Sequence, residues 1–123
     1  EPAYWMAGVQ SGEKVVLAGA AGVNKSSNDS GLTWEENTKP GREGIFGVAL
    51  NQDGAPVISG AVGLIGAMST DGEWQLADRT ELKLLSWIKT PVLMPDGSLL
   101  VLGGRGTAIT IADGKMNRLP MLQ

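Results

Sequence analysis

The stretch SSNDSGLTW, residues 26–34, decides our prediction of the fold. An aspartate in a tight turn accepts hydrogen bonds from backbone N–H groups of that turn, and glycine takes a positive φ there without steric cost. We therefore expect Ser27, Asp29, Gly31 and Thr33 to hold a hairpin. Trp34 should begin the next strand and bury its ring between neighbouring sheets.

Copies of this turn recur at a constant distance along the chain. A shortened copy contains Ser69, Asp71, Gly72 and Trp74, and a third keeps only Asp113 and Gly114. The three aspartates are 42 residues apart. Three aromatic residues in candidate strands precede the turns with a spacing of 41 residues: Trp5, Phe46 and Trp87.

Each unit reads as four short strands joined by glycine-rich turns, and 18 of the 123 residues are glycine. A period of roughly 40–45 residues with four strands per unit is typical of a β-propeller blade. We predict an all-β protein with a single partial β-propeller domain over residues 1–123. Its four-stranded antiparallel blades span about 1–41, 42–82 and 83–123.

Two segments leave alternatives open. Residues 81–88 fit a helical turn or an inner strand, and their alignment with Trp5 and Phe46 favours the strand. Residues 117–123 fit the fourth strand of the last blade or a strand that pairs with another chain. Because propellers typically have four to eight blades, we expect this chain to be part of a larger ring, or to complete one with other chains.

Composition excludes several kinds of chemistry. The sequence has no histidine and no cysteine, which removes Ser-His-Asp and Cys-His catalysis, ordinary zinc sites and disulfides. A net charge of −3 gives no support for nucleic-acid binding. No apolar run has the length of a membrane span. One carboxylate per turn supplies too few oxygens for calcium, so we predict no metal and no cofactor, and a structural role for the aspartates.

The complete turn at residues 27–34, its copy at 69–74 and the 41-residue period resemble the BNR/Asp-box repeat propellers. The segments VVLAGAAGVNKSSNDSGLTW and LLVLGGRGTAITIADGK are similar to the photosystem II stability/assembly-factor-like family, including its bacterial relatives. That resemblance implies a non-enzymatic, extracytoplasmic (periplasmic or lumenal) scaffold for protein–protein interaction. Its partners would be other protein subunits, including those of a membrane transport or assembly complex. The start at Glu1-Pro2 rather than Met is compatible with a removed export signal.

Alternating strand directions predict that Arg42, Arg79 and Arg105 share one end of the blades, opposite the aspartate turns. Guanidinium groups there would meet carboxylates of a partner, although ordinary solvated loop charge is the slightly favoured explanation. The alternative function is part of a sialidase-like glycosidase or a carbohydrate-binding propeller. A sialidase needs three convergent arginines, a Tyr nucleophile with a Glu partner and an acidic group. Tyr4 is the only tyrosine, and we expect it to pack in a buried strand. The acidic candidates are Glu43, Asp78 and Glu81.

Overall fold

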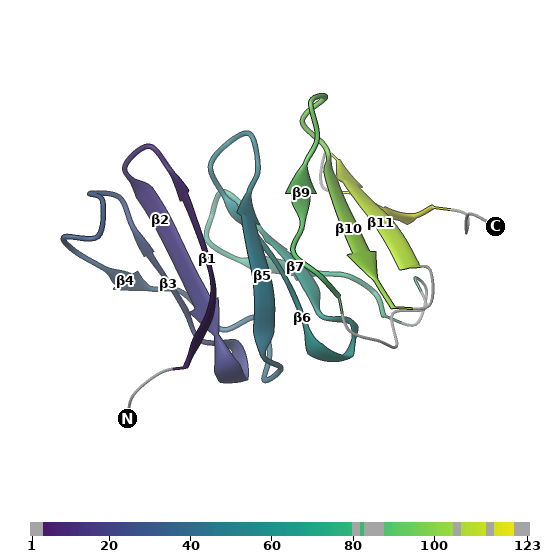
Figure 1. The fold of residues 1–123 in the computed structure, drawn as a ribbon, viewed down its shortest axis with the longest axis horizontal. Helices are drawn as coiled ribbons and strands as arrows, with labels where there is room; N and C mark the ends of the chain where they lie inside the picture. The colour runs from purple at the N-terminus through teal and green to yellow at the C-terminus, as the bar shows by residue number, and fades with distance from the viewer. Residues whose placement is uncertain (1–3, 80–81, 83–87, 105–106, 113–114, 120–123) are drawn as a thin grey trace.

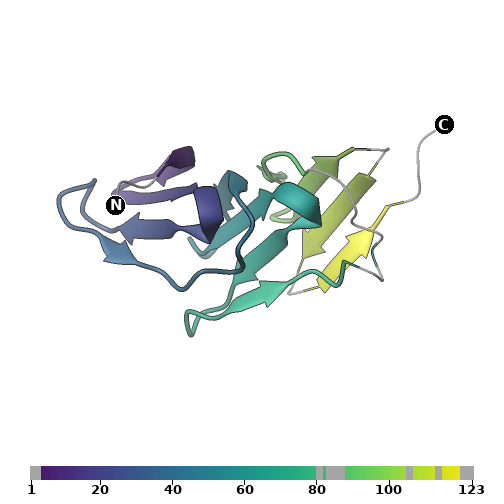
Figure 2. The same cartoon turned by 90° about the horizontal axis from the view of Figure 1, so that it is seen from below.

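The computed structural model describes residues 4–79, 82, 88–104, 107–112 and 115–119. Its strands form three four-stranded antiparallel sheets, each a meander of consecutive strands. The predicted all-β class and the predicted sheets of four antiparallel strands are confirmed. Figure 1 shows the sheets side by side in chain order, and Figure 2 shows them from below as an open fan.

Sheet 1 contains β1 (Trp5–Ser11), β2 (Lys14–Gly19), β3 (Asn24–Ser27) and β4 (Glu35–Glu36). A single 3₁₀ turn, η1 (Ala20–Gly22), joins β2 to β3. Lys14 pairs with Ser11 across the first hairpin, so only two residues form that loop. The short β4 follows directly after the Asp29 turn.

Sheet 2 contains β5 (Ile45–Leu50), β6 (Pro56–Gly60), β7 (Ile65–Met68) and β8 (Trp74–Leu76). A 3₁₀ turn, η2 (Ala61–Gly63), again joins the second strand to the third. Sheet 2 therefore has the same order of strands and turns as sheet 1.

The 3₁₀ turns repeat in their backbone angles as well. Ala21 has a φ of 58° and Val62 a φ of 55°, the left-handed conformation that costs a residue with a Cβ about 1–2 kcal/mol. In both turns the first residue accepts a hydrogen bond at its carbonyl from the N–H three residues later. Val23 donates to Ala20 and Leu64 donates to Ala61, both at 3.2 Å. The two 3₁₀ turns therefore have the same local geometry.

Sheet 3 contains β9 (Val92–Leu93), β10 (Leu99–Gly103), β11 (Thr107–Ala112) and β12 (Lys115–Arg118). β12 confirms the fourth-strand alternative for the first residues of the 117–123 tail. Of the predicted inner strand at 81–88, Ile88 forms an antiparallel bridge with Gly103. Most of that segment, including Trp87, lies outside the described residues.

The sheets pack in one direction along the chain. We call the side of a sheet that faces the preceding sheet its front, and the opposite side its rear; in sheet 1 the front is the side away from sheet 2. The rear of sheet 1 places Val16 and Ala18 in one buried cluster with Val48 and Ile58 on the front of sheet 2. This cluster is the first interface between sheets.

The second interface repeats the first one sheet later. Val57 and Ile65 on the rear of sheet 2 lie in a buried cluster with Val101 and Ile109 on the front of sheet 3. Because side chains alternate along a strand, the neighbours Val57 and Ile58 serve opposite interfaces. Sheet 2, which lies between sheets 1 and 3, is therefore apolar on both faces.

The two ends of the fan have different roles. The Asp29 turn lies beside the β1–β2 hairpin, because the Ser30 N–H donates to the Glu13 carbonyl at 2.8 Å. η1, η2 and the connections between sheets lie at the opposite end, where the Ala61 N–H donates to the carbonyl of Gly44 at 3.0 Å. We call these the turn end and the connection end.

Candidate functional site

The Asp29 turn is a closed set of short hydrogen bonds. The Asp29 Oδ1 accepts from the Thr33 N–H at 2.8 Å and from the Ser27 hydroxyl at 2.7 Å. The second carboxylate oxygen accepts from the Thr33 hydroxyl. The Gly31 N–H donates to the Ser27 Oγ at 2.8 Å, and Gly31 has a φ of 91°. Every residue predicted to hold the hairpin takes part.

The same contacts explain the acidity of Asp29. The Thr33 hydroxyl first, then the Thr33 N–H and the Ser27 hydroxyl, lower the pKa of Asp29 to about 2. Donors that bind the charged form of a carboxylate favour ionisation. The group is therefore an anion engaged by its own turn, and not a base poised for proton transfer near neutral pH.

The second turn has fewer donors. The Ser69 hydroxyl donates to the Asp71 Oδ1, and the Glu73 N–H approaches that oxygen at 3.4 Å. These contacts lower the pKa of Asp71, the Ser69 hydroxyl most. Gly72 has a φ of 84°. The predicted third copy, Asp113 and Gly114, lies outside the described residues.

A metal reading of the aspartate turns has no geometric support. Within the part of the chain that the structure describes, three acidic side chains nowhere come close enough together to hold an ion. The turn's own hydroxyl and N–H donors engage both oxygens of Asp29. The prediction of no metal stays a prediction, and the turns act as structural elements of the hairpins.

The outer strands of sheets 2 and 3 each contact the connection that leaves the preceding sheet. The Trp74 indole N–H donates to the Thr38 carbonyl at 2.6 Å, and its ring packs on the first interface cluster. One sheet later, the Arg118 guanidinium donates to the Leu82 carbonyl at 2.9 Å, while Met116 packs on the second cluster. The expected packing of an indole between sheets holds for Trp74.

The expected burial of Trp34 is wrong in this structure. The Trp34 side chain lies on the front of sheet 1, where no described strand covers it, and 37% of the residue is exposed. The Lys25 ammonium lies over the Trp34 ring at 5.1 Å from its centroid and over the Trp5 ring at 5.0 Å. Both distances are within the range of a cation–π contact.

The expected burial of Tyr4 is also wrong, because 74% of Tyr4 is exposed. It lies just before β1, and its carbonyl accepts a hydrogen bond from the Ala20 N–H at 3.0 Å. That contact places Tyr4 at the connection end. Of the acidic candidates proposed with it, Glu81 lies outside the described residues.

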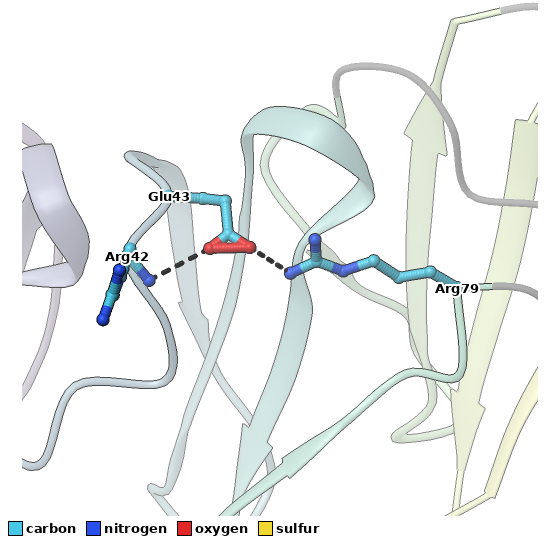
Figure 3. A network of polar contacts seen from close by, with 3 residues as sticks. All are labelled: Arg42, Glu43 and Arg79. Atoms are coloured by element: carbon cyan, nitrogen blue, oxygen red, sulfur yellow. Dashed lines mark hydrogen bonds and ion pairs between the residues drawn. The ribbon is translucent and has the colours of Figure 1, made fainter.

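Arg42, Glu43 and Arg79 lie together at the connection end, as Figure 3 shows. The Arg79 Nη2 is 2.5 Å from the Glu43 Oε1, and the Arg42 N–H donates to the Glu43 Oε2 at 3.0 Å. The Arg79 guanidinium is the main cause of the lowered pKa of Glu43. The Arg42 guanidinium points away from this pair in Figure 3 and is exposed.

The predicted arginine face is therefore altered. Arg42 remains available to a partner, whereas Arg79 is an ion-pair partner of Glu43, and Arg105 lies outside the described residues. The pair joins the connection before sheet 2 to the connection after it. Glu43 and Arg79 were predicted to lie at one end, but their pairing was not predicted, because residues 36 apart carry no local signal of contact.

The cluster of Trp5, Lys25 and Trp34 was also not predicted from the sequence. The alternation of side chains along a strand could have predicted it. Lys25 in β3 pairs with Leu17 in β2 and with Glu36 in β4, so these three residues lie on one face of the sheet. Trp34 is two residues before Glu36 and shares that face.

Neither a known family nor a curated protein matches this chain. In the described residues, moreover, no helix has the length and apolar character needed to cross a membrane.

Proposed function

We propose that the three sheets are blades of a larger BNR/Asp-box β-propeller resembling the photosystem II stability/assembly-factor-like family. In this proposal the ring is a non-enzymatic scaffold. It works outside the cytoplasm and mediates protein–protein interaction or assembly of a membrane-associated complex.

The observation that carries the proposal is the repeated front-to-rear packing of sheets with aspartate turns. Val16 and Val57 occupy the same position in consecutive sheets, and each is buried against the front of the next sheet. The aspartates that might suggest chemistry are used by their own turns. What the array offers to other molecules is its exposed surface.

The exposed guanidinium of Arg42 supports a binding role at the connection end. Planar guanidinium groups bind carboxylates in two-pronged geometry. Glu43, beside it, is already paired with Arg79. Arg42 is thus a cation available to an acidic partner at the end where the connections gather.

The test is capture of protein partners by the purified chain from an extract of its source cells, with chemical cross-linking. We expect Arg42→Glu to reduce capture several-fold, because it reverses the charge that meets the partner. Lys14→Glu, the same change in the hairpin at the turn end, is the matched control and should capture normally. Failure of the wild-type chain to capture any protein would contradict the scaffold role.

A glycosidase remains the second candidate because of one observation, the 74% exposure of Tyr4. An accessible phenol at the connection end is a possible nucleophile, whereas a packed one is not. Against this, the Arg79 guanidinium is engaged by Glu43. Turnover of a fluorogenic sialoside that disappears in Tyr4→Phe would replace the scaffold proposal with the enzyme.

A further inference from the structure

The interface between sheets 2 and 3 is incompletely packed at the turn end. A cleft of about 250 Å³ opens there between the rear of sheet 2 and the front of sheet 3. Its mouth lies between the β5–β6 hairpin and the β9–β10 hairpin, which stand side by side in Figure 1. The cleft lies between two sheets of the chain itself, so it does not depend on where the sequence begins or ends.

The floor of the cleft is apolar. Val57 and Ala67 line it from sheet 2, and Leu99 and Ile111 line it from sheet 3. Val57 pairs with Ala67, and Leu99 pairs with Ile111, so two neighbouring strands of each sheet contribute. An apolar floor with a few polar groups around it is the usual construction of a small-molecule site.

The small side chain of Ala67 helps to open the cleft. The corresponding residue of sheet 1 is Ser26, because Ser26 pairs with Val16 as Ala67 pairs with Val57. The Ser26 hydroxyl accepts a hydrogen bond from the Asn37 amide at 2.8 Å. Sheet 2 therefore has a bare methyl group where sheet 1 has a hydroxyl bonded to a neighbouring amide.

The rim of the cleft carries uncharged polar groups that the protein does not use itself. Gln52, Thr70 and Gln75 line it, and their side chains have no hydrogen-bond partner among the described residues. The Gln52 amide lies against Gly97 of the facing hairpin, where a Cβ would overlap it. A side-chain amide both donates and accepts hydrogen bonds, and so does a hydroxyl group. The rim is therefore suited to a ligand that carries several hydroxyl groups.

The charge around the cleft disfavours anions. Of the described residues that line it, Asp53 is the only charged one, and none is a lysine or an arginine. An anion would meet the Asp53 carboxylate with no cation to offset the repulsion. A small cation would gain one exposed carboxylate, which binds weakly in water, and would leave the amides unused. A neutral ligand can donate its hydroxyl hydrogens to Asp53 and use the amides as well.

We infer that this cleft binds one neutral sugar ring, with its hydroxyl groups on Gln52, Gln75 and Asp53 and its C–H groups on the apolar floor. Pockets of roughly 300–1,000 Å³ hold a drug-sized molecule, so a cleft of about 250 Å³ suits a single ring. The ring is a free monosaccharide or the terminal unit of a glycan. The site lies at the turn end, opposite Arg42 and Tyr4, and the inference rests neither on the scaffold role nor on the glycosidase alternative.

Two-dimensional amide NMR of the isotope-labelled chain tests the inference, with glucose, galactose and mannose each added up to about 50 mM. We expect at least one of them to shift the amide signals of Ala67, Gln75 and Leu99 with a millimolar dissociation constant, because its hydrogen bonds replace hydrogen bonds to water. The uronate of the same sugar, with a carboxylate in place of the CH₂OH group, is the matched ligand control and should bind at least several-fold more weakly.

The methyl glycoside of the sugar that binds distinguishes the two sources. Its anomeric oxygen is substituted, as in the terminal unit of a glycan. Binding of the methyl glycoside would support the inference with a glycan end as the source, and binding of the free sugar alone would support it with the monosaccharide as the source.

Variants test the position of the site. Ala67→Leu fills the floor and should abolish the shifts, and Gln75→Ala removes one amide and should raise the dissociation constant several-fold. Gln10→Ala removes the same group from the first hairpin, where it donates to the Gly12 carbonyl, and should bind as the wild type does. Urea denaturation checks that the three variants fold.

Three results would overturn the inference: no shifts with any of the three sugars, shifts that remain in Ala67→Leu, or equal binding of the sugar and its uronate. A chain that binds sugar and captures no protein would contradict only the scaffold role. A chain that captures a protein and binds no sugar would contradict only the inference about the cleft.

Discussion

At Asp29 a single carboxylate organises the seven residues from 27 to 33. Its partners Ser27 and Thr33 are two and four residues away, so the whole arrangement forms within one turn. Gly31 follows Ser30, and both have a positive φ. Such local hydrogen bonds are readable from sequence because no distant part of the fold takes part in them.

We expect Asp29 to make stability depend on acid. Its pKa is lowered to about 2 in the folded state, so its contribution is complete above the ordinary value near 3.8 and is lost as the pH falls from there through about 2. Asp29→Asn should lower the melting temperature at pH 7 and flatten its fall over this range. Thermal melts between pH 2 and pH 7 measure the effect. Glu35→Gln, at an exposed neighbour, is the control, and equal pH profiles for wild type and Asp29→Asn would contradict the prediction.

Trp34 and Trp74 provide a comparison of equivalent side chains. Trp74→Ala should lower the free energy of unfolding by about 3 kcal/mol, because it removes a ring packed on a neighbouring sheet. Trp34→Ala should lower the free energy of unfolding by only about 1 kcal/mol, because no described sheet lies in front of its ring. Urea unfolding at low protein concentration measures both values. Equal losses would show that the two rings have similar surroundings.

The strands use their two faces for two different interfaces. β6 places Ile58 toward sheet 1 and Val57 toward sheet 3. At its end, the buried Ser59 hydroxyl donates to the Lys89 carbonyl at 2.6 Å, which ties sheet 2 to the connection that begins sheet 3. A central strand of this array is therefore apolar on both sides and reads as a continuous hydrophobic run, whereas an outer strand alternates.

Gly47 in β5 is required by the close approach of the chain that leads into sheet 3. A Cβ at residue 47 would lie 2.4 Å from the Thr90 Cα, far inside van der Waals contact. Gly47→Ala should lower the free energy of unfolding by about 2–3 kcal/mol, as overpacking does. Gly8→Ala in β1 is the control, since its Cβ meets mainly the end of the Leu17 side chain at 3.0 Å, which can move. Urea denaturation compares them, and an equal, small loss would refute the argument.

At the scale of the whole array, Glu43 and Arg79 connect segments that flank sheet 2. Their side chains are 23% and 34% exposed, so water weakens the pair, and we expect a coupling of about 0.5 kcal/mol. A double-mutant cycle with Glu43→Gln and Arg79→Ala measures it. The pKa of Glu43 is lowered from 4.5, so the coupling should vanish as the pH falls below that value. It should also shrink in about 1 M salt, where screening acts over roughly 3 Å. A coupling unchanged by acid and salt would exclude an ion pair.

The strands and the first turn were predictable from the sequence, whereas the packing of one sheet on another was not. The period predicted three sheets of four antiparallel strands, and the composition of the first turn predicted its hydrogen bonds. The exposure of Trp34 and Tyr4 was not predictable from the sequence. Burial depends on which sheet lies in front of a side chain, and residues 34 and 74 look alike in sequence although, among the described residues, only Trp74 packs on a preceding sheet.

The sequence by itself determined the local unit: a hairpin held by Asp29, a glycine-rich turn and strands of alternating faces. These features depend on contacts between residues a few positions apart and on the period of two in a strand. Only the tertiary structure decided that Arg79 pairs with Glu43, that Trp74 reaches the Thr38 carbonyl, and that Trp34 is exposed among the described residues. The physical reason is that these outcomes depend on how whole sheets stack, which brings together residues 36 apart that no local pattern relates.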